Sequence, residues 1–454
     1  MHEDSNIMNL SKSYLYVPIE TWSREFHSKL LVALEAIKSD WTVIFGPKTE
    51  MQRWLFKLPQ GVVLQFGYHK NFHAQYEKLR KYGHKVASID EEGLVTLNPE
   101  FYRRYRVSEK TLSECDICFA WGNKHAEMLK SSAPEYEERI KIVGNPRIDL
   151  CRAEFRKSIE KEADKIRKKY DKFILINGNF GSFNHSKGIG YTWDSLESKG
   201  WLDTSADRQY HEVRIALQGT IFNNFKELIP FLVEHTSLNI VVRPHPSESL
   251  TPWLKISEKY DERVIVKRSG NVLPWIMASE VLLHNGCTTA VEAFVLNKPA
   301  ISYRPETSVE HEAALPHAVS NQAMSKNEVL DIMKNVIPIH QSKYEKRLSD
   351  LGDYIGFINE SFSHVKIVEE LNHIKLFTNE VVSNFNIHYI VNELRHYVAR
   401  IIYRKRYSYV LGKCHSLNKN TIIDEIGEMK LDSCLNLLNI RNICGRLVLL
   451  EINK

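Results

Sequence analysis

Short apolar segments alternate with longer amphipathic segments along most of this 454-residue chain. In the first third, the pattern predicts strands over 14–17, 41–45, 61–66, 85–89, 116–121 and 140–143, and a helix over 29–37. Further along, it predicts strands over 173–176, 240–242, 264–266 and 281–283, with helices over 207–236 and 273–279. Strands that alternate with helices are typical of parallel α/β sheets.

A strongly charged segment over 152–172 separates the two runs of strands and has the spacing of an exposed helix. We therefore predict an α/β protein with two Rossmann-like domains and a C-terminal extension. The expected divisions are an N-terminal acceptor and catalytic domain at 12–150, a connecting helix at 151–172, a C-terminal nucleotide-sugar-binding domain at 173–340, helices that pack back across the interface at 341–376, and a helical basic tail at 377–454.

Polar residues follow three predicted strands of the second half. The carboxyl edge of an open α/β sheet is where ligands bind, and a helix start that carries hydroxyl residues can hold a phosphate. We therefore predict a nucleotide site, although each residue taken alone could simply cap a helix or close a turn. The predicted nucleotide-sugar-binding residues are Asn177, Asn179, Arg243, His245, Pro246, Asn285, Gly286, Thr288, Thr289 and Glu292.

Acidic residues follow two predicted strands of the first half. Asp90, Glu91 and Glu92 come directly after the strand at 85–89, and Glu20 follows the first strand. Three adjacent carboxylates repel one another, so we expect at least one raised pKa and a role in acid–base or nucleophilic chemistry. The alternative is a solvated acidic loop. Arg106, a little further along, could meet either this loop or an anionic substrate.

The composition excludes some classes of protein. A net charge of +5, with 43% hydrophobic and 26% charged residues, is typical of a globular protein that does not bind nucleic acid. The sequence shows neither a secretory signal nor an apolar run of about 20 residues, which predicts a cytoplasmic location. Seven scattered cysteines indicate reduced thiols, and no metal site is expected.

The predicted tail contains a basic, amphipathic segment at 389–406. Such a helix could lie on an anionic membrane at the inner face, on a partner subunit, or on its own protein. The oligomeric state is left open by the sequence.

These motifs, taken in order, resemble those of the bacterial surface carbohydrate biosynthesis protein family, a group of GT-B glycosyltransferases related to Kdo transferases and sialyltransferases. The resemblance rests on the segment 17–31, the acid-acid-glycine loop that ends at Gly93, the pair His245-Pro246 and the pair Thr288-Thr289. It implies two Rossmann-like domains that face a central cleft, and transfer of a CMP-activated nonulosonic sugar to a glycan or lipid-linked acceptor without a cofactor.

The resemblance also implies roles for single residues. His245, Thr288 and Thr289 would hold the CMP phosphate, and one acid of 90–92 would act as a general base or a nucleophile. Three alternatives remain: a CDP-alditol phosphotransferase of the teichoic-acid type, a UDP-sugar 2-epimerase, and a non-catalytic scaffold for glycan assembly.

Overall fold

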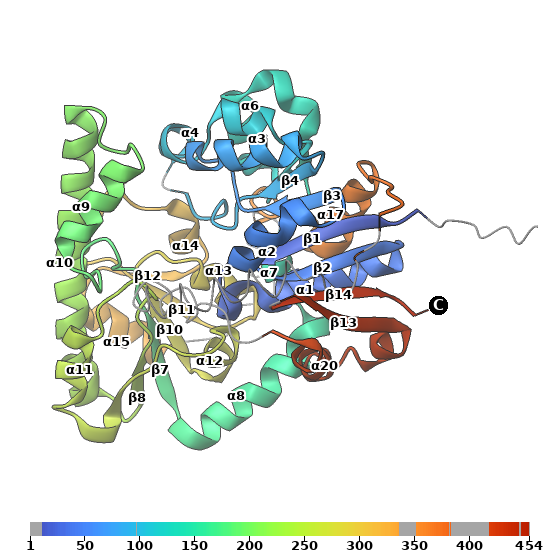
Figure 1. Ribbon diagram of the computed structural model, residues 1–454. Coiled ribbons are helices and arrows are strands. Elements are labelled where there is room, and N and C mark those ends of the chain that lie inside the picture. The colour runs from blue at the N-terminus through green and yellow to red at the C-terminus, as the bar shows by residue number, and fades with distance from the viewer. Residues whose placement is uncertain are drawn as a thin grey trace, which may run out of the picture. The chain divides into compact units, whose positions relative to one another are not determined.

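The computed structural model describes residues 11–96, 98–335, 351–380, 382, 417–444 and 446–453. They form two compact α/β units (Figure 1). The first unit comprises residues 1–91, 106–150 and 354–454, and the second comprises 92–105 and 151–353, as far as these ranges are described.

The first unit is built on an eight-stranded sheet with the order β13-β14-β2-β1-β3-β4-β5-β6. Six of its strands are parallel and confirm the predicted ones: β1 (Ser13–Ile19), β2 (Trp41–Pro47), β3 (Gly61–Gln65), β4 (Lys85–Ile89), β5 (Ile117–Ala120) and β6 (Ile140–Ile142). β1 and β2 are buried along their whole length, as expected of parallel strands with helices on both faces.

The helices of the first unit are α1 (Trp22–Lys38), α2 (Lys48–Trp54), α3 (His73–Lys81), α5 (Glu109–Ser113), α6 (Asn123–Ser132), α7 (Pro146–Asp149), α17 (Ser363–Asn372) and α20 (Lys419–Glu428). α1 begins earlier than the predicted helix at 29–37. Trp22 stacks on Phe26, and Glu25 places a negative charge in the first turn, where the helix dipole favours it.

The C-terminal extension is not the wholly helical tail that the sequence suggested. β13 (Leu438–Cys444) and β14 (Leu447–Ile452) form an antiparallel hairpin, and β14 pairs with β2 at the edge of the sheet. The hairpin covers this edge because residues 447–450 are apolar and become buried. The basic segment at 389–406 lies outside the described residues.

The second unit contains a six-stranded parallel sheet with the order β12-β11-β10-β7-β8-β9. Its strands are β7 (Phe173–Asn177), β8 (Asn239–Val242), β9 (Val264–Val266), β10 (Val281–His284), β11 (Ala300–Tyr303) and β12 (Asn321–Ala323). Its helices are α4 (Pro99–Tyr105), α8 (Arg156–Tyr170), α9 (Ile189–Ser198), α10 (Ser205–His235), α11 (Thr251–Ser257), α12 (Leu273–Ala278), α13 (Thr289–Val295), α14 (Ala314–Ala318) and α15 (Lys326–Lys334).

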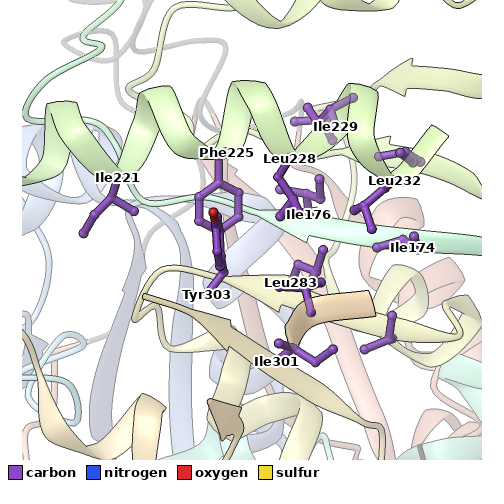
Figure 2. Packing of buried hydrophobic residues seen from close by; sticks show 14 of the residues in the cluster. Ile174, Ile176, Ile221, Phe225, Leu228, Ile229, Leu232, Leu283, Ile301 and Tyr303 are labelled. Carbon is purple, nitrogen blue, oxygen red and sulfur yellow. The ribbon is translucent and has the colours of Figure 1, made fainter. Parts of the chain in front are cut away.

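The core of the second unit lies between α10 and the sheet. Figure 2 shows Phe225, Leu228 and Leu232 of this helix above Ile176 of β7 and Ile301 of β11. The helix is 31 residues long and begins with a capping box made by Thr204 and Asp207. This core fixes the positions of the strand ends that carry the predicted nucleotide residues.

Three of the expected domain boundaries need correction. Residues 92–105 belong to the second unit, because Phe101 and Tyr105 pack on Trp201. α8 is part of the second unit rather than a separate connector, since Arg167 donates to the Met277 carbonyl at 2.8 Å. α17 belongs to the first unit, and the residues 336–350 before it are not described.

Candidate functional site

Three strand ends of the second unit meet at one place. Asn177 at the end of β7 is in register with His284 at the end of β10, and Ile176 before it is in register with Val242 at the end of β8. In the next turn, the Asn179 amide donates to Asn285 Oδ1 at 2.8 Å, and Cys287 Sγ donates to the Asn177 carbonyl at 3.6 Å. The structure therefore brings together Asn177, Asn179 and the 285–289 loop, as the sequence predicted.

Asn177 has an unusual environment. Its side chain is 4% exposed, and neither Nδ2 nor Oδ1 has a hydrogen-bond partner among the described residues. Buried amide groups are almost always paired, so an unpaired one needs an explanation. Asn177 offers both a donor and an acceptor where the strand ends converge, which suits a bound polar ligand.

His245 is presented by a tight turn after β8. Its Nδ1 lies 2.7 Å from Ser247 Oγ and accepts the Ser247 N–H at 3.2 Å. With Nδ1 used as an acceptor, the neutral ring carries its proton on Nε2. The imidazole is exposed, so it can donate to a ligand phosphate.

Glu248 holds this turn together, although it was not among the residues predicted to form the site. The carboxylate is fully buried and accepts the backbone N–H groups of His245 at 3.0 Å and Phe180 at 3.1 Å. It therefore ties the loop after β7 to the loop after β8. Burial raises the pKa of Glu248. The spacing was the missed signal, because His245 and Glu248 are three residues apart in a turn that contains Pro246.

The 285–289 loop is shaped by histidines beneath it. His284 Nδ1 accepts the Gly286 N–H at 3.0 Å, and His284 Nε2 lies 2.8 Å from Ser320 Oγ. Gly286 has φ of 93°, and a Cβ there would come within 3.1 Å of His317. Glycine is therefore required at this position.

The hydroxyl pair begins a short helix, α13. Thr288 is the residue before its first turn, and Thr289 Oγ1 lies 2.6 Å from Cys287 Sγ. Burial raises the pKa of Cys287 to about 11, so the thiol stays protonated and is a poor nucleophile. Glu292 is buried on the same helix.

Arg243 is occupied elsewhere in the second unit. Its guanidinium donates to the carbonyls of Ser269 and Gly270, both at 2.9 Å, and lies 4.9 Å from the Trp275 ring. These contacts describe a structural anchor. The prediction that Arg243 binds the nucleotide receives no support from them.

The acidic residues of the first unit are ion-paired. Asp90 Oδ1 lies 2.8 Å from Arg106, so this arginine meets the acidic loop, and the Asp90 carbonyl accepts the Trp121 indole N–H at 2.6 Å. Glu20 lies 3.0 Å from Lys48. Glu92 is exposed and belongs to the second unit, whereas Asp90 and Glu91 belong to the first.

At least one of the three acids was expected to have a raised pKa, and Glu91 is not that one. Burial alone would raise its pKa, but Lys29, 2.7 Å away and equally buried, outweighs burial and lowers it. A carboxylate held in its ionised form is a weak general base. Lys29 was a missed signal, since it is a single lysine beside the apolar run 30–34 of α1.

The part of the chain that the structure describes contains no group of three metal-ligating side chains. None of its helices is both long enough and apolar enough to cross a bilayer. Cys115 and Cys118 are buried free thiols of the first unit.

No protein-family model matches this sequence, and no curated protein matches it at the sequence level. A solved structure from Listeria monocytogenes, assigned as a UDP-N-acetylglucosamine 2-epimerase, is similar in fold, with a TM-score of 0.51 and 13% identity over 80% of this chain and 96% of that chain. The fold is of the GT-B type, as predicted.

Two further solved structures are less similar. The UDP-GlcNAc 2-epimerase of Neisseria meningitidis bound to UDP-GlcNAc has a TM-score of 0.47 and 16% identity, over 80% of this chain and 100% of that chain. The wall teichoic acid polymerase TagF has a TM-score of 0.49 and 12% identity, over 81% of this chain and 89% of that chain. None of the three is a Kdo transferase or a sialyltransferase, so the expected relation to those enzymes is not shown.

Proposed function

We propose that the chain is an enzyme that binds a nucleotide-activated sugar or alditol through its second unit and breaks the bond between that group and the nucleotide. The observation that carries the proposal is the unpaired, buried amide of Asn177 at the point where three strand ends meet. The GT-B fold agrees with it, since such folds bind ligands at the carboxyl edges of their sheets.

The residues of the second unit suit the departing phosphate. His245 would donate from Nε2, and the hydroxyls of Thr288 and Thr289 would add further donors. Donors that are already in place when negative charge develops on the leaving group lower the barrier for bond cleavage. We assign Asn177 and Asn179 to the polar groups of the nucleotide or its sugar.

We assign the acid–base step to the first unit. Asp90 or Glu20 would accept a proton from the acceptor hydroxyl, whereas Glu91 would remain ionised beside Lys29. An Asp90→Asn variant should bind the nucleotide as the wild type does and lose turnover about 100-fold or more. If turnover is unchanged by Asp90→Asn and by Glu20→Gln, the assignment of the acid–base step to the first unit is wrong.

Three donors fit this chemistry. The sequence motifs favour a CMP-activated nonulosonic sugar. The similar structures instead correspond to the two enzyme alternatives, in which the donor is a UDP-sugar with no acceptor, or a CDP-alditol whose phosphate is transferred. In either transfer reaction the acceptor would be a surface glycan or a lipid-linked precursor.

Ligand-induced thermal stabilisation with CMP, CDP, UMP and UDP tests the proposal. At about 100 times its dissociation constant, a ligand should stabilise the protein by about 2.7 kcal/mol. His245→Ala should reduce this effect, whereas His235→Ala, at an exposed position at the end of α10, should not. Binding of CMP or CDP would favour a cytidine-activated donor, either the nonulosonic sugar or the alditol, whose transfer also releases CMP, whereas binding of UDP would favour the epimerase. If none of the four binds, the proposal is wrong.

A further inference from the structure

The first turns of α10 extend beyond the core of the second unit. The helix has 31 residues, so it is about 46 Å long, whereas its neighbours β7 and β8 have only 5 and 4 residues. The fully buried residues that it contributes to the core begin at Ile221, which Figure 2 labels, and the partly buried Leu217 packs against them. Because α10 leads back from the end of β7 to the start of β8, its free end lies at the carboxyl edge of the sheet.

One face of this free end carries His211, Arg214 and Gln218. These positions are three and four residues apart, so their side chains lie on the same side of the helix. His211 is 1% exposed, and its Nε2 has no hydrogen-bond partner among the described residues. Arg214 Nε and Gln218 Oε1 are likewise buried and without a partner among those residues.

Arg214 is a half-buried cation, and among the described residues it has no counter-ion. Its guanidinium lies 5.5 Å from the Phe101 ring, and no carboxylate of the described residues pairs with it. Burial lowers its pKa. A buried charge normally has a partner, because its transfer from water costs several kcal/mol otherwise.

The acids in the neighbourhood do not fill this role. Asp207 is bound by Arg104 at 2.7 Å, by Tyr105 and by the capping box with Thr204. Glu310 is exposed, and its charge acts on Tyr210 and His311. Burial lowers the pKa of both His211 and His311, and the nearby positive charge of Arg214 lowers them further.

The loop after β7 links this face to the predicted nucleotide site. Phe183 of that loop packs so closely on α10 that a Cβ at Gly219 would come within 2.6 Å of its ring. Two residues earlier, a Cβ at Gly181 would lie 3.6 Å from His245 Nδ1. One short loop therefore contacts both α10, next to Gln218, and the histidine assigned to the leaving phosphate.

We propose that His211, Arg214 and Gln218 form a second binding site, which takes the carboxylate or phosphate of an acidic substrate while Gln218 binds a neighbouring hydroxyl. The inference rests on the proposed function in one respect, namely that the anion belongs to the substrate of that reaction. The site selects an acidic sugar or a phosphorylated alditol over a neutral sugar.

Small probes separate the two chemical sources of the anion. Glucuronate presents a carboxylate on a sugar, and sn-glycerol 3-phosphate presents a phosphate on an alditol; glucose and glycerol are their neutral counterparts. Thermal stabilisation by each probe is measured at constant ionic strength on wild type, Arg214→Gln and the control Arg208→Gln. Arg208 is an exposed arginine of the same helix, so the control carries the same change of charge.

At least one anionic probe should stabilise the wild type and Arg208→Gln, and its neutral counterpart should not. Arg214→Gln should weaken binding of that probe about tenfold or more, because it removes a charged hydrogen-bond donor. Arg214→Lys should retain part of the affinity, because it keeps the positive charge. If Arg214→Gln folds poorly, Gln218→Leu, at a partly exposed position, gives a second test and should also weaken binding of the probe.

Equal effects of the probe on Arg214→Gln and Arg208→Gln would overturn the inference, as would the absence of any anion-specific effect. The nucleotide experiment keeps this outcome separate from the proposed function. If nucleotides bind and anions do not, only the second site is wrong. If anions bind to wild type and to His245→Ala alike but no nucleotide does, the second site stands and the proposed function falls.

Discussion

The residues singled out as candidate site residues in the two units are buried in different ways. In the first unit, charged groups are matched with one another, as Glu91 is with Lys29 and Asp90 is with Arg106. In the second unit, the amide of Asn177 and the guanidinium nitrogen Nε of Arg214 are buried without partners among the described residues. Buried charges that are paired with one another keep a fixed charge pattern. Buried polar groups without a hydrogen-bond partner can instead be stabilised by a ligand that supplies one.

The largest effect is expected from breaking a buried pair of the first unit. Lys29→Met leaves Glu91 buried without its counter-ion and should lower the free energy of unfolding by about 3–5 kcal/mol. The matched control is Lys38→Met on the same helix, whose pair with Glu35 is exposed and should contribute about 0–1 kcal/mol. Chemical denaturation measures both, and the double variant Lys29→Met/Glu91→Gln should recover much of the loss. Equal effects of the two lysine variants would contradict the first half of the comparison.

A variant of Arg243 tests whether this residue, predicted to bind the nucleotide, instead contributes only to the stability of the second unit. Arg243→Gln should lower the free energy of unfolding by about 2–3 kcal/mol, since two carbonyls lose a charged donor. Nucleotide affinity should change little. A large loss of affinity with normal stability would show instead that Arg243 belongs to the binding site.

The buried His284 of the second unit should make the stability of the protein depend on pH. Burial lowers the pKa of His284 to about 3, well below the ordinary histidine value of about 6.5. The unfolded chain therefore binds this proton first, and stability is lost as the pH falls from about 6.5 towards 3, by up to about 1.4 kcal/mol per pH unit.

His284→Asn keeps an acceptor for the Gly286 N–H and removes the titrating group. Urea denaturation between pH 7 and 5 should therefore show a shallower loss of stability for this variant than for the wild type. An unchanged slope would mean that His284 has the same pKa in the folded and the unfolded protein.

The smallest change in stability is expected at Asn177. Asn177→Leu replaces an unsatisfied amide with an apolar group, so the unliganded protein should be unchanged or more stable by about 1 kcal/mol. The same variant should lose nucleotide binding, as judged by calorimetric titration. A variant that is clearly destabilised would show that the amide is satisfied without a ligand.

The sequence predicted the elements whose signal is local. Short β-branched runs such as 240–242 became buried strands, and Asn177 and Asn285 were placed together because parallel strands end at one edge. The C-terminal hairpin was missed because its apolar strand at 447–450 follows a basic amphipathic segment that suggested helix throughout. The pairing of β14 with β2 joins segments about 400 residues apart, and no local pattern indicates it.

The electrostatics of the site could not be predicted in the same way. Three adjacent acids suggested a raised pKa, but burial, which would raise the pKa of Glu91, is outweighed by Lys29, a residue distant in the sequence, and the pKa is lowered. Asp90 likewise pairs with a residue of another segment, Arg106. Likewise, nothing near Arg214 in the sequence indicates that it lacks a counter-ion, because this follows from the packing of 92–105 and of the loop at 304–312 around α10. Charge balance in a core depends on partners that only the fold brings together.

The most direct test of the account is hydrogen–deuterium exchange with and without the nucleotide that stabilises the protein best. We predict slower exchange in three segments of the second unit, 177–185, 245–249 and 285–289, and the same segments should stay unprotected in Asn177→Leu. Protection confined to other segments, or the same protection in that variant, would contradict the claim that the unsatisfied edge of the second unit is the nucleotide site.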